Sequence, residues 1–240
     1  MFDVVVIGGG PCGATAAEDL ARSGHCLALL DRDGRIKPCG GAIPPRLMAD
    51  FDIGPEQLLA RVTTARMVSP TGRHVDIGIE NGFVGMVDRK DFDPLLRARA
   101  ESAGAIRATG TFLRIERDEE ATRVIYREKA SGEERALPTR LVIGADGANS
   151  RVGKAEVPGA DAIPLVFAYH EIIAAPQADP SFDPARCDVI YDREHSTPLE
   201  PGGMVDIAIN WQRFGEMIFL LEVDPQDRIA EASEVDNRAF

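Results

Sequence analysis

The sequence predicts an α/β fold in which a parallel sheet comes first and a mixed or antiparallel sheet, incomplete at the C-terminus, follows. Apolar runs at 3–7 and 26–31 are typical of buried strands, and a helical pattern at 12–23 lies between them. A glycine-rich turn joins the first run to the helix. Strand, helix and strand in so short a stretch form a βαβ unit, whose two strands run parallel.

The composition is that of an ordinary globular chain and narrows the classes of partner. The 240 residues are 44% hydrophobic and carry a net charge of −12, so no basic surface for nucleic acid is expected. No apolar run approaches the ~20 residues of a membrane span, and the N-terminus lacks a signal peptide. We therefore expect a cytoplasmic location. The four cysteines form no C-x-x-C pair, so no metal site is expected.

The region after the βαβ unit is predicted to add short helices, a hairpin and further strands. A turn with proline and glycine, "PTG", separates the two halves of the hairpin. The predicted elements are helices at 46–51 and 55–60, a hairpin at 63–79, a helix at 91–102, strands at 111–117 and 121–128, and an apolar strand within 140–147.

A change in composition near Val157 divides the chain into two predicted domains. Residues 1–156 form the nucleotide-binding domain, interrupted by β insertions around 62–88 and 111–138. Residues 157–240 form part of a substrate-binding sheet, with strands predicted at 165–173, 187–191, 205–209 and 217–223.

The turn after the first strand carries a G-x-G-x-x-G motif, as in Rossmann-like nucleotide-binding units. Gly8 allows the tight turn, Gly10 lets the backbone approach a pyrophosphate, and Gly13 lets the helix pack close to the strand. Pro11 and Cys12 open the helix, whose N-terminus offers free N–H groups and a positive dipole end. The motif, flanked by strand and helix, predicts a dinucleotide site.

Asp31 ends the second strand and indicates which dinucleotide binds. A carboxylate at this spacing can accept hydrogen bonds from both hydroxyls of an adenosine ribose. The same carboxylate would repel a 2′-phosphate, so FAD or NAD is expected rather than NADP. Arg32 follows directly and is counted with this site.

A second set of polar residues follows the apolar strand near residue 144. Asp146 and Gly147 lie at its carboxyl end, and Ser150 and Arg151 begin a predicted helix. Ligands of open α/β sheets bind at the carboxyl ends of strands, so a second contact to the same dinucleotide is expected here. The alternative is a plain strand-to-helix turn in which Asp146 caps the helix.

Four stretches together resemble the geranylgeranyl reductases, which belong to the p-hydroxybenzoate hydroxylase-like flavoproteins. The stretches read "DVVVIGGGPCGATAA", "KPCGGAIPPRL", "VDRKDFD" with a following "GA", and "VIGADGANSRV". The resemblance extends from residue 2 to about 192 and is strongest to the chlorophyll and bacteriochlorophyll branch of the family. The "KPCGG" loop combined with "GADGANSRV" is the most specific part.

The resemblance implies one bound FAD and a transient NADPH, which reduces the flavin and leaves. The residues implied to contact FAD are Gly8, Gly10, Pro11, Cys12, Gly13, Asp31, Arg32, Cys39, Gly40, Gly41, Arg89, Asp146 and Gly147. Asp146 and Gly147 would also lie near the approach of NADPH. Arg89 has a second interpretation, as a solvated side chain just before a helix.

The implied reaction saturates C=C bonds of a geranylgeranyl chain to the phytyl form. The substrate would be the prenylated (bacterio)chlorophyll or the free prenyl diphosphate, and its apolar chain implies peripheral association with a photosynthetic membrane. One alternative is an FAD-dependent monooxygenase or halogenase of the same fold. Another is a truncated, non-catalytic FAD-binding remnant, because residues after Asp192 depart from the family and no Gly-Asp pair occurs.

Two side chains are weak candidates for the proton donor of this reaction. Cys39 lies in the loop expected near the flavin ring, with Lys37 as the only obvious cation nearby. The alternative for Cys39 is a small residue that fits a tight turn. His170 lies on a predicted strand, and its alternative is an ordinary surface or core histidine. A bound water is a third source of the proton.

Overall fold

The structure, a computed structural model, describes residues 1–163 except 35, 38, 40, 81 and 120, together with residues 180 and 182–191. The chain divides into two compact units. The first consists of Met1–Leu59 and Gly85–Pro164, and the second of Ala60–Val84 and Leu165–Phe240. Every predicted site residue that the structure describes belongs to the first unit.

The first unit opens with the predicted βαβ unit, formed by β1 (Phe2–Ile7), α1 (Pro11–Arg22) and β2 (Leu27–Asp31). The two strands pair in parallel, as their burial on both faces requires. Four consecutive residues at the end of β1 and at the start of β2 are buried, which explains the unbroken apolar runs.

Three long strands complete the main sheet of this unit: β8 (Ile106–Arg117), β9 (Thr122–Glu128) and β10 (Glu134–Gly144). The pairings form a closed ring in the order β1, β10, β9, β8 and β2. The predicted strand at 111–117 was too short, because β8 begins at Ile106 and its first residues pair in parallel with β2. The apolar strand predicted within 140–147 is the second half of β10.

Both β8 and β10 change partners midway along their length. β8 pairs with β2 up to Thr109 and with β9 from Gly110 onward. β10 pairs with β9 up to Thr139 and with β1 from the same residue. A Cβ at Gly110 would lie 2.2 Å from the carbonyl oxygen of Arg127, so the partner change in β8 requires glycine.

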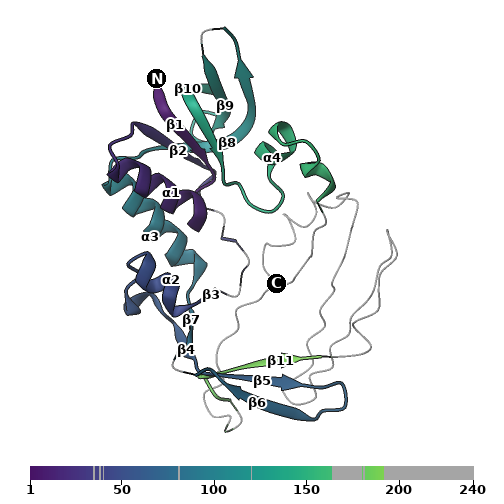
Figure 1. Cartoon of the computed structure of the whole chain (residues 1–240). Helices are drawn as coiled ribbons and strands as arrows, with labels where there is room; N and C mark the ends of the chain where they lie inside the picture. The colour runs from purple at the N-terminus through teal and green to yellow at the C-terminus, as the bar shows by residue number, and fades with distance from the viewer. Residues whose placement is uncertain are drawn as a thin grey trace. The chain divides into compact units, whose positions relative to one another are not determined.

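The parallel strands lie between helices and antiparallel strands (Figure 1). One face packs against α1 and α3 (Arg89–Ser102), through a buried cluster of Val4, Val6, Ala17, Leu27, Leu29, Ala100 and Ala105. The other face packs against β8, β9 and α4 (Arg151–Glu156), through Val5, Ile7, Ala28, Leu30, Phe112, Val124, Tyr126 and Val152. The loops that follow β1, β2 and β10 therefore leave the same edge of the sheet.

Shorter elements fill the rest of the first unit. They are β3 (Ala42–Ile43), α2 (Pro45–Asp50), the 3-10 turns η1 (Pro55–Gln57) and η2 (Ala160–Ala162), and β7 (Val84–Met86), which begins at the unit boundary. The helix predicted at 55–60 is only the turn η1, because residue 60 already begins β4 (Ala60–Val62). β3 pairs antiparallel with β7.

The described part of the second unit contains a small mixed sheet. β5 (Thr64–Val68) and β6 (His74–Gly78) form the predicted antiparallel hairpin, and β11 (Arg186–Ile190) pairs with β5 in parallel. The strands predicted at 165–173, 205–209 and 217–223 lie outside the described residues. A parallel βαβ start with mixed sheets confirms the predicted α/β fold.

No helix in the described part of the chain is both long and apolar enough to cross a membrane.

Candidate functional site

The turn between β1 and α1 is built so tightly that two of its glycines are required by the protein itself. Gly8 has a φ of 109°, and a Cβ there would lie 2.3 Å from the carbonyl oxygen of Ala145, just after β10. A Cβ at Gly13 would lie 1.9 Å from the carbonyl oxygen of Gly8. These contacts bring the turn against the loop that follows β10 and fix the start of α1.

Gly10 differs from Gly8 and Gly13, because no atom of the described residues lies close enough to require glycine there. Its backbone is extended, with a φ of −72°, and a Cβ there would meet nothing within 4 Å. Pro11 begins α1, Cys12 is exposed in its first turn, and no described side chain caps this helix. The turn thus offers uncapped N–H groups beside an open backbone, which fits the pyrophosphate of a dinucleotide.

Asp31 lies where its carboxylate can hold the turn and still bind a ligand. The N–H of Gly9 donates to Oδ2 at 2.9 Å, and the N–H of Asp33 donates to Oδ1 at 2.9 Å. Each oxygen keeps further acceptor capacity, and the side chain is 20% exposed. The carboxylate therefore fits the hydroxyls of a ribose. Arg32, the next residue, is exposed.

Arg97 on α3 is a site residue that sequence reasoning missed. Its side chain is only 8% exposed and donates to the carbonyl oxygen of Gly9 at 3.1 Å. Its guanidinium also lies 3.9 Å from Asp31 and 3.8 Å from Asp33. No local pattern in the sequence indicated this role, because Arg97 and Gly9 are 88 positions apart and meet only in the fold.

Asp146 follows β10, and its carboxylate accepts hydrogen bonds from neighbouring residues of the protein. The N–H groups of Arg151 and Val152 donate to its Oδ2 at 2.7 and 3.2 Å, and the hydroxyl of Ser150 donates to Oδ1. Ser150 in turn accepts from the N–H of Gly153 at 2.7 Å. The N-cap residue of α4 is Ser150 and not Asp146, but the carboxylate of Asp146 accepts from the first two N–H groups of the helix, so any ligand here would meet mainly backbone.

The thiol of Cys39 has two hydrogen-bond donors, one from its own loop and one from the start of α3. The backbone N–H of Gly41 donates to the sulfur and lowers the pKa of Cys39, although partial burial opposes this. The guanidinium of Arg89 also donates to the sulfur, and the charges of Arg89 and Lys37 lower the pKa of Cys39 further. The expectation that Lys37 was the only cation nearby was therefore wrong. Cys39 remains exposed.

Arg89 is not the solvated side chain of the second interpretation, because it is only 10% exposed. Its Nε and one terminal nitrogen donate to the two carboxylate oxygens of Asp93 at 2.5 and 2.8 Å. Asp93 is itself 8% exposed, and its hydrogen bond raises the pKa of Arg89. Asp93 thereby holds the guanidinium of Arg89 in place beside Cys39.

Gly41 and Gly147 place the Cys39 loop against its neighbours. Gly41 has a φ of 69°, and a Cβ there would lie 1.9 Å from the carbonyl oxygen of Val87. The protein itself thus requires glycine at 41. Gly147 has a φ of 96°, and a Cβ there would lie 4.0 Å from Nζ of Lys37.

Contacts between neighbouring segments join most of the predicted site residues into one continuous region. Asp31 contacts the glycine turn through Gly9, and the turn meets the end of β10 through Gly8. The loop after β10 lies beside Lys37 through Gly147. Gly40 and His170 lie outside the described residues.

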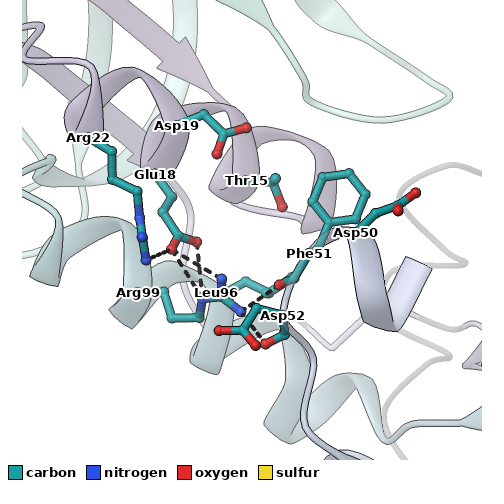
Figure 2. A pocket seen from close by; sticks show the side chains of 9 residues that line it. All are labelled: Thr15, Glu18, Asp19, Arg22, Asp50, Phe51, Asp52, Leu96 and Arg99. Atoms are coloured by element: carbon teal, nitrogen blue, oxygen red, sulfur yellow. Dashed lines mark hydrogen bonds and ion pairs between the residues drawn. The ribbon is translucent and has the colours of Figure 1, made fainter. Parts of the chain in front are cut away.

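A cavity of about 180 Å³ lies between α1, α3 and the end of α2 (Figure 2). Its buried carboxylate, Glu18, accepts hydrogen bonds from Arg22 at 2.6 Å and from Arg99 at 3.2 Å. Arg99 also donates to the carbonyl oxygens of Phe51 and Asp52. Since Glu18 and the two arginines already bond to one another, we interpret the cavity as packing between helices.

Comparison with known proteins agrees with this geometry. The FAD binding domain family matches residues 1–163. The geranylgeranyl diphosphate reductase of Rhodobacter capsulatus is 65% identical over 80% of this chain and 48% of its own. The chloroplastic geranylgeranyl diphosphate reductase of Oryza sativa subsp. japonica is 39% identical over 72% of this chain and 40% of its own. The chain thus spans about half the length of these relatives.

Solved structures share the fold at lower sequence identity. A geranylgeranyl bacteriochlorophyll reductase-like protein from Thermoplasma acidophilum has a TM-score of 0.65 and 22% identity, over 80% of this chain and 51% of its own. The myxobacterial chondrochloren halogenase has a TM-score of 0.54 and 23% identity, over 62% of this chain and 38% of its own. The chain belongs to the FAD binding domain family and is a homologue of the geranylgeranyl diphosphate reductases.

Proposed function

We propose that this chain binds FAD and acts as an NADPH-dependent reductase. The reaction would saturate C=C bonds of a geranylgeranyl chain in bacteriochlorophyll synthesis. The identity of 65% to the Rhodobacter capsulatus reductase is the observation that carries this proposal. The substrate is the free diphosphate or the same chain esterified to the pigment.

The residues that would hold FAD fall into two parts of the site. The glycine turn, through the backbone at Gly10 and the start of α1, binds the pyrophosphate, and Asp31 accepts from the ribose. The Cys39 loop and Arg89, which lie beside each other, would face the flavin ring. Gly147 and its neighbours supply backbone at the pyrophosphate, since the carboxylate of Asp146 is occupied at α4.

The reaction needs one hydride and one proton for each double bond. Bound FAD, once reduced by NADPH, supplies the hydride to one carbon of the double bond. We assign the proton on the other carbon to the thiol of Cys39, whose S–H bond breaks as the new C–H bond forms. The electron pair left on sulfur is stabilised by the N–H of Gly41 and by Arg89. Because Cys39 is exposed, solvent returns its proton.

The second unit offers a surface suited to an apolar chain. Residues whose side chains alternate onto one face of its sheet are all apolar or Cys: Ala65, Met67, Val75, Ile77, Cys187 and Val189. Among them, Val75 and Ile77 are 57% and 51% exposed. An exposed apolar sheet face of this kind supports binding of a prenyl chain by residues of this unit.

The proposal is tested by flavin binding followed by turnover. The full chain is mixed with FAD, passed through a gel-filtration column and examined for a flavin spectrum. NADPH oxidation and oxygen consumption are then measured with geranylgeranyl diphosphate and, separately, with the prenylated pigment. We expect bound flavin and NADPH oxidation that depends on the prenyl substrate without matching oxygen use. Matching oxygen use would favour a monooxygenase, and absence of bound flavin would identify an inert remnant.

The role of Cys39 has a test of its own. Alkylation of Cys39 by iodoacetamide, followed by peptide mass spectrometry, should have a pH midpoint below the ordinary thiol value of about 8.5, because Gly41 and Arg89 favour the thiolate. Arg89→Gln should raise that midpoint, while Cys26, which lies outside the proposed site, serves as an exposed thiol for comparison. Cys39→Ala should retain FAD and lose turnover, and full turnover by Cys39→Ala would assign the proton to water.

A further inference from the structure

The contacts of Arg97 are unusual for a helix residue remote in sequence from the nucleotide motif. Its guanidinium is buried and lies near the backbone of the glycine turn and near two acids, Asp31 at the end of β2 and Asp33 just after it. Arg107, at the start of β8, adds a second cation 3.6 Å from Asp33. Two arginines thus balance the charges of Asp31 and Asp33.

Gly9 provides an independent sign that Arg97 is part of the turn. The G-x-G-x-x-G motif leaves this position free, yet this chain has glycine there. A Cβ at Gly9 would lie 2.8 Å from Cδ of Arg97 and 2.8 Å from Cβ of Asp31. Glycine at this position therefore makes room for both side chains rather than for a ligand.

We propose that Arg97 is a positioning residue of the dinucleotide site, which orients Asp31 and anchors the glycine turn before the cofactor binds. The proposal rests on FAD binding as proposed above. Arg97 holds the turn at the carbonyl of Gly9, while Asp31 holds it at the N–H of the same residue. One buried cation thereby fixes the groups for the pyrophosphate and for the ribose together.

The physical reason lies in the two neighbouring carboxylates. Asp31 and Asp33 follow one another closely, and like charges at short range repel each other unless cations lie between them. Without Arg97, the partly exposed carboxylate of Asp31 would turn toward water. Cofactor binding would then be weakened by the free-energy cost of ordering that side chain again. A pre-ordered Asp31 avoids that cost.

A double-mutant cycle measured by FAD titration of the full chain tests this role. Arg97→Gln should raise the Kd for FAD about tenfold, which is typical of a lost hydrogen bond to a charged group. In the background of Asp31→Asn the same change should raise Kd by less than about threefold, because the residue it positions has already lost its charge. An equal factor in both backgrounds, or none in either, would overturn the proposal.

Arg99→Gln is the matched control, since Arg99 lies on the same helix and binds Glu18 instead of the nucleotide turn. It should leave the Kd for FAD within about twofold. If Arg97→Gln proves unfolded by circular dichroism, Arg97→Lys replaces it, with an expected loss of about threefold that vanishes in the Asp31→Asn background. A wild-type chain that binds no FAD refutes the proposed function, whereas FAD binding insensitive to Arg97 refutes this inference alone.

Discussion

Asp31 and Asp146 occupy equivalent places in the sheet and have different surroundings. Asp31 is the last residue of β2 and Asp146 follows β10 by two residues, both strands pair with β1 in parallel, and each acid was predicted to contact the same cofactor. Asp31 accepts one hydrogen bond on each oxygen, from loop backbone, and keeps capacity for a ligand. Asp146 accepts three, all from Ser150 and the start of α4. An acid at the end of a strand can contact a ligand or cap a helix. The hydrogen bonds that its carboxylate already accepts, rather than its position, show which of the two roles it has.

The largest effect should come from Asp31→Ala. Loss of a charged acceptor for the ribose hydroxyls should weaken FAD binding by roughly 10- to 100-fold. The measurement is a titration of the apo-protein with FAD, followed by flavin fluorescence. Asp33→Asn is the control, because it keeps the backbone N–H that donates to Asp31 and tolerates the left-handed backbone at this position. If Asp31→Ala binds FAD as tightly as the wild type, Asp31 is not a ligand contact, and it no longer differs from Asp146 in that respect.

Asp146→Ala should lower stability more than it lowers affinity. The change removes three hydrogen bonds at the start of α4, so we expect about 2 kcal/mol less free energy of unfolding. Urea denaturation of the FAD-free protein measures this. A loss of FAD affinity as large as that of Asp31→Ala, with unchanged stability, would show that Asp146 is a ligand contact after all.

Ser150→Ala should have the smallest effect. It removes the hydroxyl that accepts from Gly153, but Asp146 keeps its bonds to the backbone of Arg151 and Val152. We expect a loss of about 1 kcal/mol, as for other N-cap residues, in the same urea experiment. A cost greater than that of Asp146→Ala would mean that Ser150, and not the acid, is the main cap.

The sequence was sufficient for features that depend on neighbouring residues. The apolar runs of β1 and β2, the three motif glycines and the hairpin of β5 and β6 all follow from local patterns. The start of β8 was missed because residues 106–110 alternate polar with apolar and look unlike a parallel strand.

Contacts between distant segments could not be predicted in this way. Arg97 meets Gly9 across 88 positions. Arg89 and Cys39 come together only because the Cys39 loop packs against the residues after β7. Helical spacing indicates that Arg89 and Asp93 share a face, but it does not reveal which loop that face meets. The charged residues nearest the site are therefore the part of the site that could be identified only from the folded structure.

The partner changes of β8 and β10 have a consequence for how the chain is made. β1 is synthesised well before β10, whose half that pairs with β1 is complete only at residue 144. Until then one edge of β1 has no strand to pair with, and its buried valines and isoleucine are open to other chains. β8 and β10 each belong to both the parallel and the antiparallel part of the sheet. Neither part of the sheet can therefore form completely without the other. We expect the first unit to form in one late, cooperative step that a chaperone which shields β1 would assist.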